Sequence, residues 1–484
     1  MDDSRYNGIP ARGEIILKGD PRMETYRRDA VMAGDPDVVV RPRDWQEVSE
    51  ITAWCNGNKI PLTICGSRTS MSGSSVAEEG VLLTTENFSK VIDIGERDGH
   101  PYAITEPGVI VGEFQKIVEE KGYSYPTVPT SVNEALIGST VATNATGEDF
   151  YKYGPTRNYI RELEFIKANG SKDIFTRKRT DVPKVSKGLG GYYLGGSKID
   201  WLIGSEGTLG IISKVVVDLL PGVPETFIIL MPFESNMTGL KFIDKVNRSS
   251  MRPRAMEFID KFALSIMRTH KTCPKFPGDV QSLVYVKQEV DGNRDELIDK
   301  WFGLIEGSTK FIDETIIAET EKQKKDIHTW RHHIPSMIKE KNEEFQKVGG
   351  GKIEGDWWVP RDKILKMMAT VYNEADGAGI DYVAYGHLGD GHPHTDYICK
   401  TRAEFERADE LVKTQSRRAV EYGGGVAAEH GIGKVKRDLL AIQYTSDIIA
   451  KMRELKEQFD PNWILGRGNI LTNETPGVRP LVSH

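Results

Sequence analysis

Residues 203–212 read Ile203-Gly204-Ser205-Glu206-Gly207-Thr208-Leu209-Gly210-Ile211-Ile212. The glycines predict a backbone that turns tightly and lets another group approach closely. The Val-rich segment that follows is typical of a strand. Stretches of small residues recur upstream, at 66–75, 137–147 and 153–156. Because these stretches share one half of the chain, we expect their backbone to line one extended ligand.

The stretch at 66–75 follows a predicted strand at 61–65, and no helical pattern follows it. A dinucleotide-binding fingerprint of the Rossmann type needs a helix there, so that type of site is excluded. A P-loop is excluded as well, since Gly-Lys-Ser/Thr does not occur in the sequence. The N–H groups and hydroxyls of the loop suit a pyrophosphate. A plain flexible loop would explain this segment if it stood alone.

Local signals predict individual elements. The run Val38-Val39-Val40 is a strand candidate, and Asp44 is expected to cap a helix that Asn56-Gly57 stops. From about Pro224 longer amphipathic helices appear, the clearest between Thr401 and the glycines at 423–425. The pattern therefore changes between the two halves of the chain.

Size and charge narrow the class of protein. A chain of 484 residues is too long for one typical core, so two or more domains are expected. The net charge of −7 without a long basic run argues against nucleic acid or an anionic membrane as the main partner. No apolar run is long enough to span a bilayer, and the N-terminus lacks a signal core, so we expect a cytoplasmic protein. The four cysteines form no CxxC and hold no iron–sulfur cluster by themselves.

Histidine and glycine combine in two segments near the C-terminus, Gly386-His387-Leu388-Gly389-Asp390-Gly391-His392-Pro393-His394 and Glu429-His430-Gly431-Ile432-Gly433-Lys434. Seven of the ten histidines lie between His328 and His430. Imidazole and carboxylate are ligands for Zn, Mn or Fe, so these segments predict a divalent metal site. The alternative is a chance cluster of surface histidines on hairpin loops.

These elements, in this order, resemble the FAD-linked oxidase family, which includes D-lactate dehydrogenases, D-2-hydroxyglutarate dehydrogenases and glycolate oxidase flavin subunits. The resemblance runs from about Pro36 to Leu471, and its most specific matches are 205–211 and 429–433. It implies an α+β fold with a two-part FAD-binding domain of the vanillyl-alcohol-oxidase type, residues 1–223 and 456–484. It also implies an α/β cap domain with an antiparallel sheet, residues 224–455, that carries substrate and metal.

The resemblance further implies which residues bind the cofactor. Residues 66–70 would hold the FAD pyrophosphate, and the segment 138–147 would line the flavin. Residues 206–212 would complete the wall of the FAD site. No histidine lies in the loop where some relatives attach flavin covalently, so non-covalent FAD is expected. The cofactor residues expected are Gly66, Ser67, Arg68, Thr69, Ser70, Pro129, Gly138, Ser139, Thr143, Asn144, Gly147, Gly154, Glu206, Gly207, Thr208, Gly210, Ile211, Ile212 and Asn469.

For the metal, expected to be Zn with Mn or Fe as alternatives, the resemblance implies His387, His394 and Glu429 as ligands. It implies His430 as the catalytic base. Our choice for the group that anchors the substrate carboxylate is Arg331, because a guanidinium can donate two hydrogen bonds to a carboxylate. A surface ion pair is the alternative for Arg331.

The sequence departs from the family pattern at several positions. Arg68 replaces a usual Gly and could supply charge for phosphate, and Ser139 replaces the second Gly of a pair. His392 stands where Asn is usual, and it could add a third imidazole or alter substrate contacts. The ending at 465–470 differs from the usual Asn-Pro-Gly-Lys and leans toward the alkyl-dihydroxyacetonephosphate synthases.

The leading expectation is an FAD- and metal-dependent enzyme that oxidises a small D-2-hydroxy acid of the lactate, glycolate or 2-hydroxyglutarate type. Electrons would leave through oxygen, a quinone, an electron-transfer flavoprotein or a separate iron–sulfur subunit. One alternative is a synthase-like flavoenzyme without net redox, against which Glu429-His430-Gly431 counts, since those relatives carry consecutive histidines. Another is a non-catalytic electron-transfer subunit, which would not need the three expected metal ligands. The oligomeric state, a homodimer included, is left open.

Overall fold

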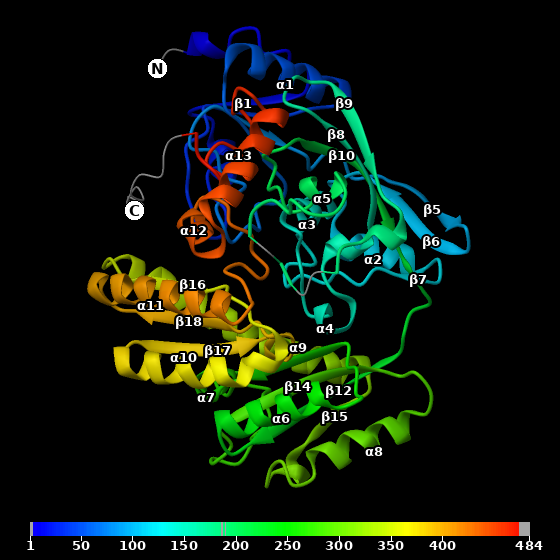
Figure 1. The fold of residues 1–484 in the computed structure, drawn as a ribbon, viewed down its shortest axis with the longest axis vertical. Helices are drawn as coiled ribbons and strands as arrows, with labels where there is room; N and C mark the ends of the chain where they lie inside the picture. Colours follow the sequence, from blue (N-terminus) through cyan, green and yellow to red (C-terminus); the bar gives the residue numbers. More distant parts are fainter. Residues whose placement is uncertain (1–2, 185–186, 189, 474–484) are drawn as a thin grey trace. The chain divides into compact units, whose positions relative to one another are not determined.

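The computed structural model describes residues 3–184, 187–188 and 190–473 (Figure 1). It divides into two compact units. Unit 1 comprises 1–147, 155–223 and 429–484, and unit 2 comprises 148–154 and 224–428. This division differs from the expected boundaries in two ways. The chain returns to unit 1 at Glu429 rather than at 456, and a short segment inside the N-terminal half belongs to unit 2.

Unit 1 contains a four-stranded sheet in the order β1-β2-β4-β3. Strands β2, β4 and β3 run parallel, and β1 pairs antiparallel with β2. Val38 and Val40 pack with Val48 and Ile51 of α1 (Trp45–Asn58) in one core. Such burial suits the continuous apolar runs of parallel strands. The strands are β1 (Glu14–Leu17), β2 (Val38–Arg41), β3 (Leu62–Cys65) and β4 (Val81–Thr84).

A second sheet of unit 1 is antiparallel throughout, in the order β5-β6-β10-β8-β9, and a two-stranded sheet pairs β7 with β11. The Val-rich segment expected after Gly210 is its central strand, β10. The strands are β5 (Val91–Arg97), β6 (His100–Thr105), β7 (Tyr123–Ser124), β8 (Ile160–Ile166), β9 (Lys172–Thr176), β10 (Ile211–Asp218) and β11 (Leu220–Pro221). The other helices of unit 1 are α2 (Val111–Glu119), α3 (Ile137–Thr143), α5 (Ile199–Leu202), α12 (Leu440–Gln443) and α13 (Ser446–Phe459).

Local predictions in unit 1 can be compared directly with the structure. The Asp44 cap is confirmed, since its side chain accepts a hydrogen bond from the Glu47 N–H. The predicted stop at Asn56-Gly57 is two residues early, because the helix ends only where Lys59 adopts the left-handed conformation. The segment 66–80, described throughout, contains neither helix nor strand. The expectation that no helix follows the loop is therefore confirmed.

Unit 2 is built on a seven-stranded antiparallel sheet in the order β15-β12-β14-β13-β17-β18-β16. Side chains alternate between its faces, as expected for strands. On β12, Phe227 and Ile229 face one core and Ile228 faces the other. The strands are β12 (Thr226–Phe233), β13 (Ala255–Ile259), β14 (Ser282–Glu289), β15 (Ile316–Ala318), β16 (Gly351–Gly355), β17 (Asp381–Gly386) and β18 (His394–Cys399).

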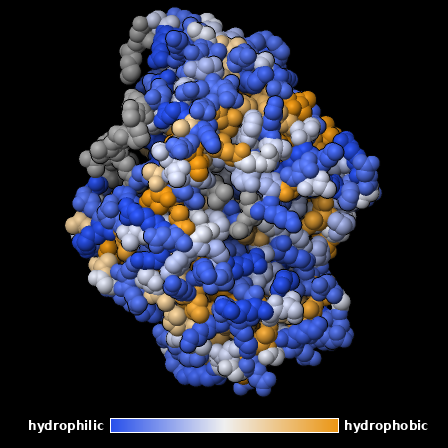
Figure 2. Space-filling view, in the orientation of Figure 1, coloured by the Kyte–Doolittle hydropathy of each residue, from blue (hydrophilic) through white to orange (hydrophobic). Residues whose placement is uncertain are grey.

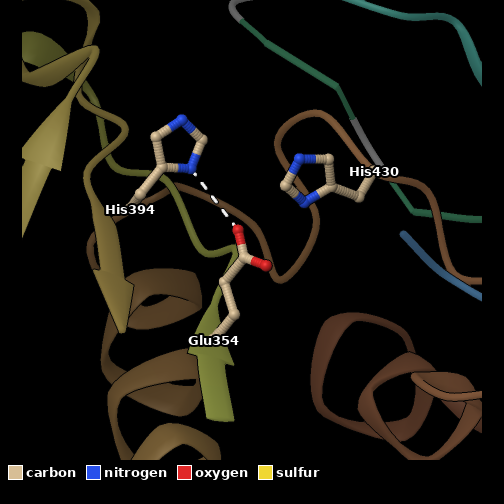
Figure 3. Close-up of side chains that lie close together, drawn as sticks. All are labelled: Glu354, His394 and His430. Atoms are coloured by element: carbon tan, nitrogen blue, oxygen red, sulfur yellow. Dashed lines mark ion pairs between the residues drawn. The ribbon is translucent and has the colours of Figure 1, made fainter. Parts of the chain in front are cut away.

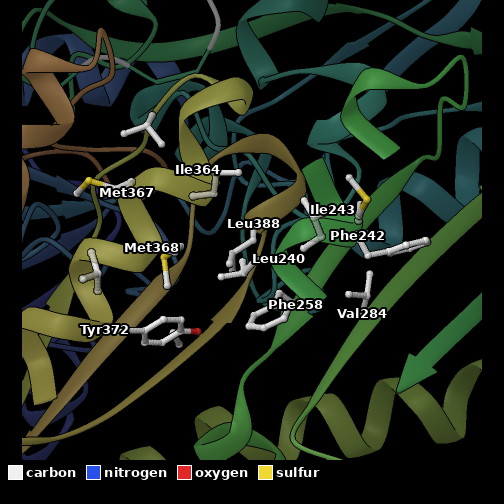
Figure 4. Close-up of a cluster of buried hydrophobic side chains, with 14 of the residues drawn as sticks. Leu240, Phe242, Ile243, Phe258, Val284, Ile364, Met367, Met368, Tyr372 and Leu388 are labelled. Carbon is white, nitrogen blue, oxygen red and sulfur yellow. The ribbon is translucent and has the colours of Figure 1, made fainter. Parts of the chain in front are cut away.

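Helices cover both faces of this sheet. Residues of α6, α8, α10 and α11 fill one core, part of which Figure 4 shows, and residues of α7 and α9 fill the other. The predicted helix after Thr401 is confirmed as α11, with Thr401 as its cap. The helices of unit 2 are α4 (Phe150–Tyr153), α6 (Asn236–Arg248), α7 (Lys261–Met267), α8 (Arg294–Ile305), α9 (Glu321–Gln346), α10 (Ile364–Ala378) and α11 (Arg402–Glu421).

The surface is mainly hydrophilic on the face shown in Figure 2, where apolar residues form small separate patches. Among the described residues, no helix combines the length and apolar character needed to cross a bilayer. The cytoplasmic localisation stays a prediction.

Candidate functional site

Two histidines of unit 2 lie on the connection between β17 and β18, and a third is the first residue of β18. They are His387, His392 and His394, and all are buried. The connection turns tightly at Gly391, which has a φ of +92° and where a Cβ would lie 1.9 Å from the Val359 carbonyl oxygen. The turn brings the rings together, with centroids 4.8 to 6.2 Å apart. The alternative of a surface cluster is therefore wrong for these three histidines.

Each of the three rings has its Nδ1 next to an acceptor. His387 Nδ1 lies 3.0 Å from Glu257 Oε1 of β13. His394 Nδ1 lies 3.4 Å from Glu354 Oε1 of β16 (Figure 3). His392 Nδ1 lies 2.9 Å from the Trp357 carbonyl oxygen. Carboxylates and carbonyls only accept hydrogen bonds, so Nδ1 is the donor atom in each of these three contacts. This is the orientation that metal-binding histidines adopt in proteins.

Arg331 lies on α9 and forms a two-point ion pair with Glu257. Its Nη2 lies 2.6 Å from Glu257 Oε1, and its Nε donates to Oε2. Burial would raise the pKa of Glu257, but the charge of Arg331 and the hydrogen bond from His387 outweigh it and lower the pKa well below its usual range. The Arg331 guanidinium thus fixes the carboxylate that holds His387. Its role as the substrate anchor stays a prediction.

The segment 148–154 belongs to unit 2 because its acidic residues pair there. Asp149 lies 2.6 Å from Arg254 Nη2 and 3.2 Å from Lys287 Nζ. Glu148 accepts a hydrogen bond of 2.5 Å from the Tyr285 hydroxyl and lies 3.3 Å from His328 Nε2. Gly154, one of the predicted cofactor residues, is the last residue of this segment and therefore belongs to unit 2.

In unit 1, Glu206 joins segments that are far apart in the sequence. Its carboxylate accepts hydrogen bonds of 2.7 Å from the N–H groups of Ile432 and Gly433. Burial raises the pKa of Glu206 to about 7, and these two N–H groups offset the rise only in part. The two most specific motifs of the sequence, 205–211 and 429–433, are therefore bound to each other within unit 1.

Asn469 and Lys434 extend this arrangement. The Asn469 side-chain amide donates to the carbonyl oxygens of Ser74 and Glu206, at 2.8 and 3.1 Å. The Lys434 ammonium donates to Asn469 Oδ1 at 2.7 Å. Sequence reasoning missed Lys434, although a lysine inside the 429–434 motif together with an ending that lacks its usual lysine was a usable signal.

Glu429 and His430 follow Ala428, the last residue of unit 2, and belong to unit 1. Within unit 1, the Thr146 hydroxyl donates a hydrogen bond of 2.6 Å to Glu429 Oε1. Lys187 Nζ lies 3.8 Å from the same oxygen. The roles of Glu429 as a ligand and of His430 as a base stay predictions.

The loop at 66–75 has two features that bear on a pyrophosphate. Ser67 Oγ is buried and has no hydrogen-bond partner among the described residues. Arg68 has a φ of +60°, in the left-handed region that favours glycine. Its guanidinium lies 4.7 Å above the Tyr26 ring and 2.9 Å from Glu86. In this structure the Arg68 charge is therefore directed at Glu86.

Several glycines that were predicted to approach the cofactor are required by packing within unit 1. A Cβ on Gly138 would lie 2.3 Å from Pro107 Cβ, and one on Gly147 would lie 2.0 Å from the Val128 carbonyl oxygen. The remaining predicted cofactor residues also belong to unit 1, namely Gly66, Thr69, Ser70, Pro129, Ser139, Thr143, Asn144, Gly207, Thr208, Gly210, Ile211 and Ile212.

Two family descriptions match the chain. Residues 36–172 match an FAD binding domain, and residues 224–470 match the C-terminal domain of FAD linked oxidases. Glycolate oxidase subunit GlcD of Bacillus subtilis is 29% identical over 91% of this chain and 90% of its own length. D-lactate dehydrogenase of Anaerostipes hadrus is 29% identical over 94% of both chains.

Solved structures share the fold. 4-Ethylphenol oxidase from Gulosibacter chungangensis aligns with a TM-score of 0.68 over 95% of this chain and 94% of its own, at 17% identity. An alkyldihydroxyacetonephosphate synthase aligns with a TM-score of 0.63 over 91% of this chain and 77% of its own, at 16% identity. At these identities the likeness concerns the fold alone, and the expected vanillyl-alcohol-oxidase-type fold with antiparallel sheets is confirmed.

Proposed function

Because the chain belongs to the FAD-linked oxidase family, we propose that it oxidises a small D-2-hydroxy acid to the 2-oxo acid with FAD and a divalent metal. The observation that carries the proposal is the pair of buried histidines, His387 and His394, each with Nδ1 next to a carboxylate. The names of the relatives support the substrate class, since they act on lactate and glycolate.

The cofactor groups supply what side chains cannot. FAD, when bound, would supply the hydride acceptor that the oxidation of the substrate carbon requires. A divalent metal, when bound, acts as a Lewis acid that makes the substrate hydroxyl more acidic. The donor set fits such an ion, because two neutral imidazoles and a carboxylate suit Zn, Mn or Fe. We propose His387, His394 and Glu429 as the ligands.

Residues of the chain would perform the remaining tasks. His430 takes the hydroxyl proton, because a neutral imidazole is the usual general base near pH 7. Arg331 keeps Glu257, and through it His387, in place, and we retain it as the candidate partner of the substrate carboxylate. The buried Ser67 hydroxyl and the N–H groups of 66–70 hold the FAD pyrophosphate without a covalent bond.

Anaerobic mixing of the purified flavoprotein with D-lactate, glycolate and D-2-hydroxyglutarate tests the proposal. We expect one of these acids to bleach the flavin absorbance and L-lactate to leave it unchanged. Failure of every 2-hydroxy acid to reduce the flavin would contradict the proposal and favour the synthase-like alternative. If one of the acids reduces the flavin, the reduced protein can be mixed with candidate electron acceptors, namely an electron-transfer flavoprotein, an iron–sulfur subunit or a quinone.

A further inference from the structure

We infer that Lys434 is a positioning residue for FAD, because its ammonium fixes the loop at 66–75 in the conformation that receives the pyrophosphate. The inference rests on the FAD of the proposed function and is independent of the metal. Lys434 is not among the cofactor residues that the family resemblance implies. All of the groups that carry the inference belong to unit 1.

The Lys434 ammonium links the loop at 66–75 to the end of the chain. It donates hydrogen bonds to the Gly73 carbonyl oxygen at 3.4 Å and to Asn469 Oδ1 at 2.7 Å. The Asn469 amide in turn donates to the Ser74 carbonyl oxygen at 2.8 Å. The Lys434 backbone N–H donates to the Ser72 carbonyl oxygen at 2.8 Å. Three consecutive carbonyl groups of the loop are therefore held by Lys434 and Asn469.

The Lys434 side chain is buried in a narrow space between two glycines. Gly73 and Gly468 have φ values of +74° and +83°. A Cβ on Gly73 would lie 3.5 Å from Lys434 Cβ, and one on Gly468 would lie 3.5 Å from Lys434 Cε. A Cβ on Gly433 would lie 2.0 Å from the Ser72 carbonyl oxygen, so the two backbones are in contact there. Packing as well as hydrogen bonding thus fixes the lysine against the loop.

The preceding part of the same loop offers hydrogen-bond donors. Among the residues that the structure describes, the N–H groups of 67–70 donate no hydrogen bond, and Ser67 Oγ is buried without a partner. Successive N–H groups in a turn bind anions such as phosphate. They bind best when the loop is already ordered, because ordering it during binding costs conformational entropy. Holding the carbonyl groups of 72–74 supplies that order.

The origin of the positive charge distinguishes this chain from the family pattern. The usual ending is Asn-Pro-Gly-Lys, and matching its glycine to Gly468 places Asn469 at the position of the lysine. The ammonium on this loop therefore comes from position 434 instead. Burial lowers the pKa of Lys434 to about 8, and the charges of Glu78 and Asp29 offset that effect only in part. The negative charge of a pyrophosphate nearby would favour the charged form.

The experiment measures the binding of FAD, ADP and riboflavin to the FAD-free full chain by calorimetry. ADP carries the pyrophosphate without the flavin, and riboflavin carries the flavin without the pyrophosphate. We expect Lys434→Met to weaken FAD and ADP binding at least ~10-fold, the usual loss when hydrogen bonds from a charged group are removed. Riboflavin binding should be unchanged. Lys451→Met, on the exposed side of α13, is the matched control and should bind all three as the wild type does.

A double variant tests the exchange between the two positions. Lys434→Met with Asn469→Lys returns the ammonium to the chain end, so FAD and ADP affinity should recover; no recovery would overturn the exchange. If Lys434→Met does not fold, Asn469→Ala, which removes the link to Ser74, is measured in its place. The same pattern is expected, with ADP binding weakened and riboflavin binding unchanged.

The remaining outcomes separate the inference from the proposal on which it rests. Wild-type affinity of Lys434→Met for FAD and ADP would overturn the inference. Equal weakening of ADP and riboflavin binding would overturn it as well, since Lys434 would then support the fold as a whole. A wild type that binds neither FAD nor ADP would overturn the FAD of the proposed function and this inference with it. Failure of every 2-hydroxy acid to reduce the flavin would leave the inference standing, because these measurements need no substrate.

Discussion

Two buried glutamates, one in each unit, have pKa values that are shifted in opposite directions. In unit 1, Glu206 is held by two backbone N–H groups, and burial raises its pKa to about 7. In unit 2, Glu257 is held by Arg331 and His387, and the charge of Arg331 together with the His387 hydrogen bond overcomes burial and lowers its pKa. The dipoles of backbone N–H groups offset the pKa rise caused by burial only in part. The full charge of Arg331 at hydrogen-bond distance more than offsets that rise.

The difference indicates what each region is built to do. Glu206 ties backbone segments together, as suits a wall of loops around an extended cofactor. Glu257 orients one imidazole through a fixed ion pair, as suits a small site that needs a defined geometry. Substitutions in the two units test this difference.

The largest effect is expected on the segment that holds Glu206, at His430. If His430 is the base, His430→Asn should slow flavin reduction by about 10²–10⁴-fold, because the hydroxyl proton loses its acceptor. Anaerobic stopped-flow at saturating substrate measures this, with FAD and metal contents checked first. The exposed His100→Asn serves as the control. A folded, loaded variant that reduces flavin at the wild-type rate would remove the base role and leave the turn at Gly431–Gly433 as the function of this residue.

The next largest effect is expected in unit 2. Glu257→Gln leaves the buried Arg331 without its counter-charge and should cost about 3–5 kcal/mol of stability. It should also weaken metal binding by about 10–100-fold, because His387 loses its acceptor. Urea unfolding and chelator competition measure the two quantities.

A double variant separates these two effects. Glu257→Gln with Arg331→Met removes the unpaired charge, so stability should recover while metal affinity stays low. Recovery of both quantities would mean that Glu257 does not orient His387, and the contrast between the two glutamates would lose its functional meaning.

A smaller effect concerns Glu206 and pH. Its pKa is about 7 in the folded chain against 4.5 ordinarily, so the folded state holds the proton more tightly. Its contribution to stability is therefore complete below pH 4.5 and is lost as the pH rises through 7. The loss should amount to about 3 kcal/mol, and Glu206→Gln should remove this pH dependence. Urea unfolding of the FAD-free protein across this range tests it; parallel curves for the two proteins would show that Glu206 does not titrate there.

The smallest effect is expected at Arg68, whose left-handed backbone strains any residue with a Cβ. Arg68→Gly relieves that strain and loses the pair with Glu86, so stability should change by less than about 1 kcal/mol. Arg68→Ala loses the pair and keeps the strain, so it should be less stable than the glycine variant by about 1 kcal/mol. Thermal unfolding compares them. If Arg68 binds phosphate in the loaded protein, both variants would also weaken FAD binding equally.

Local sequence was enough for the features that depend on near neighbours. The Asp44 cap acts three residues ahead on the Glu47 N–H, and Gly386 and Gly391 supply the positive φ angles at which the chain bends in the histidine turn. The absence of a helix after the 66–75 loop could be read directly from its composition. The family resemblance supplied the fold class, because the order of motifs along the chain is itself specific.

Tertiary structure alone decided the pairings across strands and loops. Arg331 pairs with Glu257, 74 residues away, because α9 packs on the face of the sheet where β13 presents that carboxylate. Lys434 meets Asn469 because both segments close on the 66–75 loop. The segment 148–154 joins unit 2 through Arg254 and Lys287, residues that no local pattern connects to it. A residue's neighbours along the chain set its backbone conformation, but strand order and helix packing determine which charged group its side chain contacts.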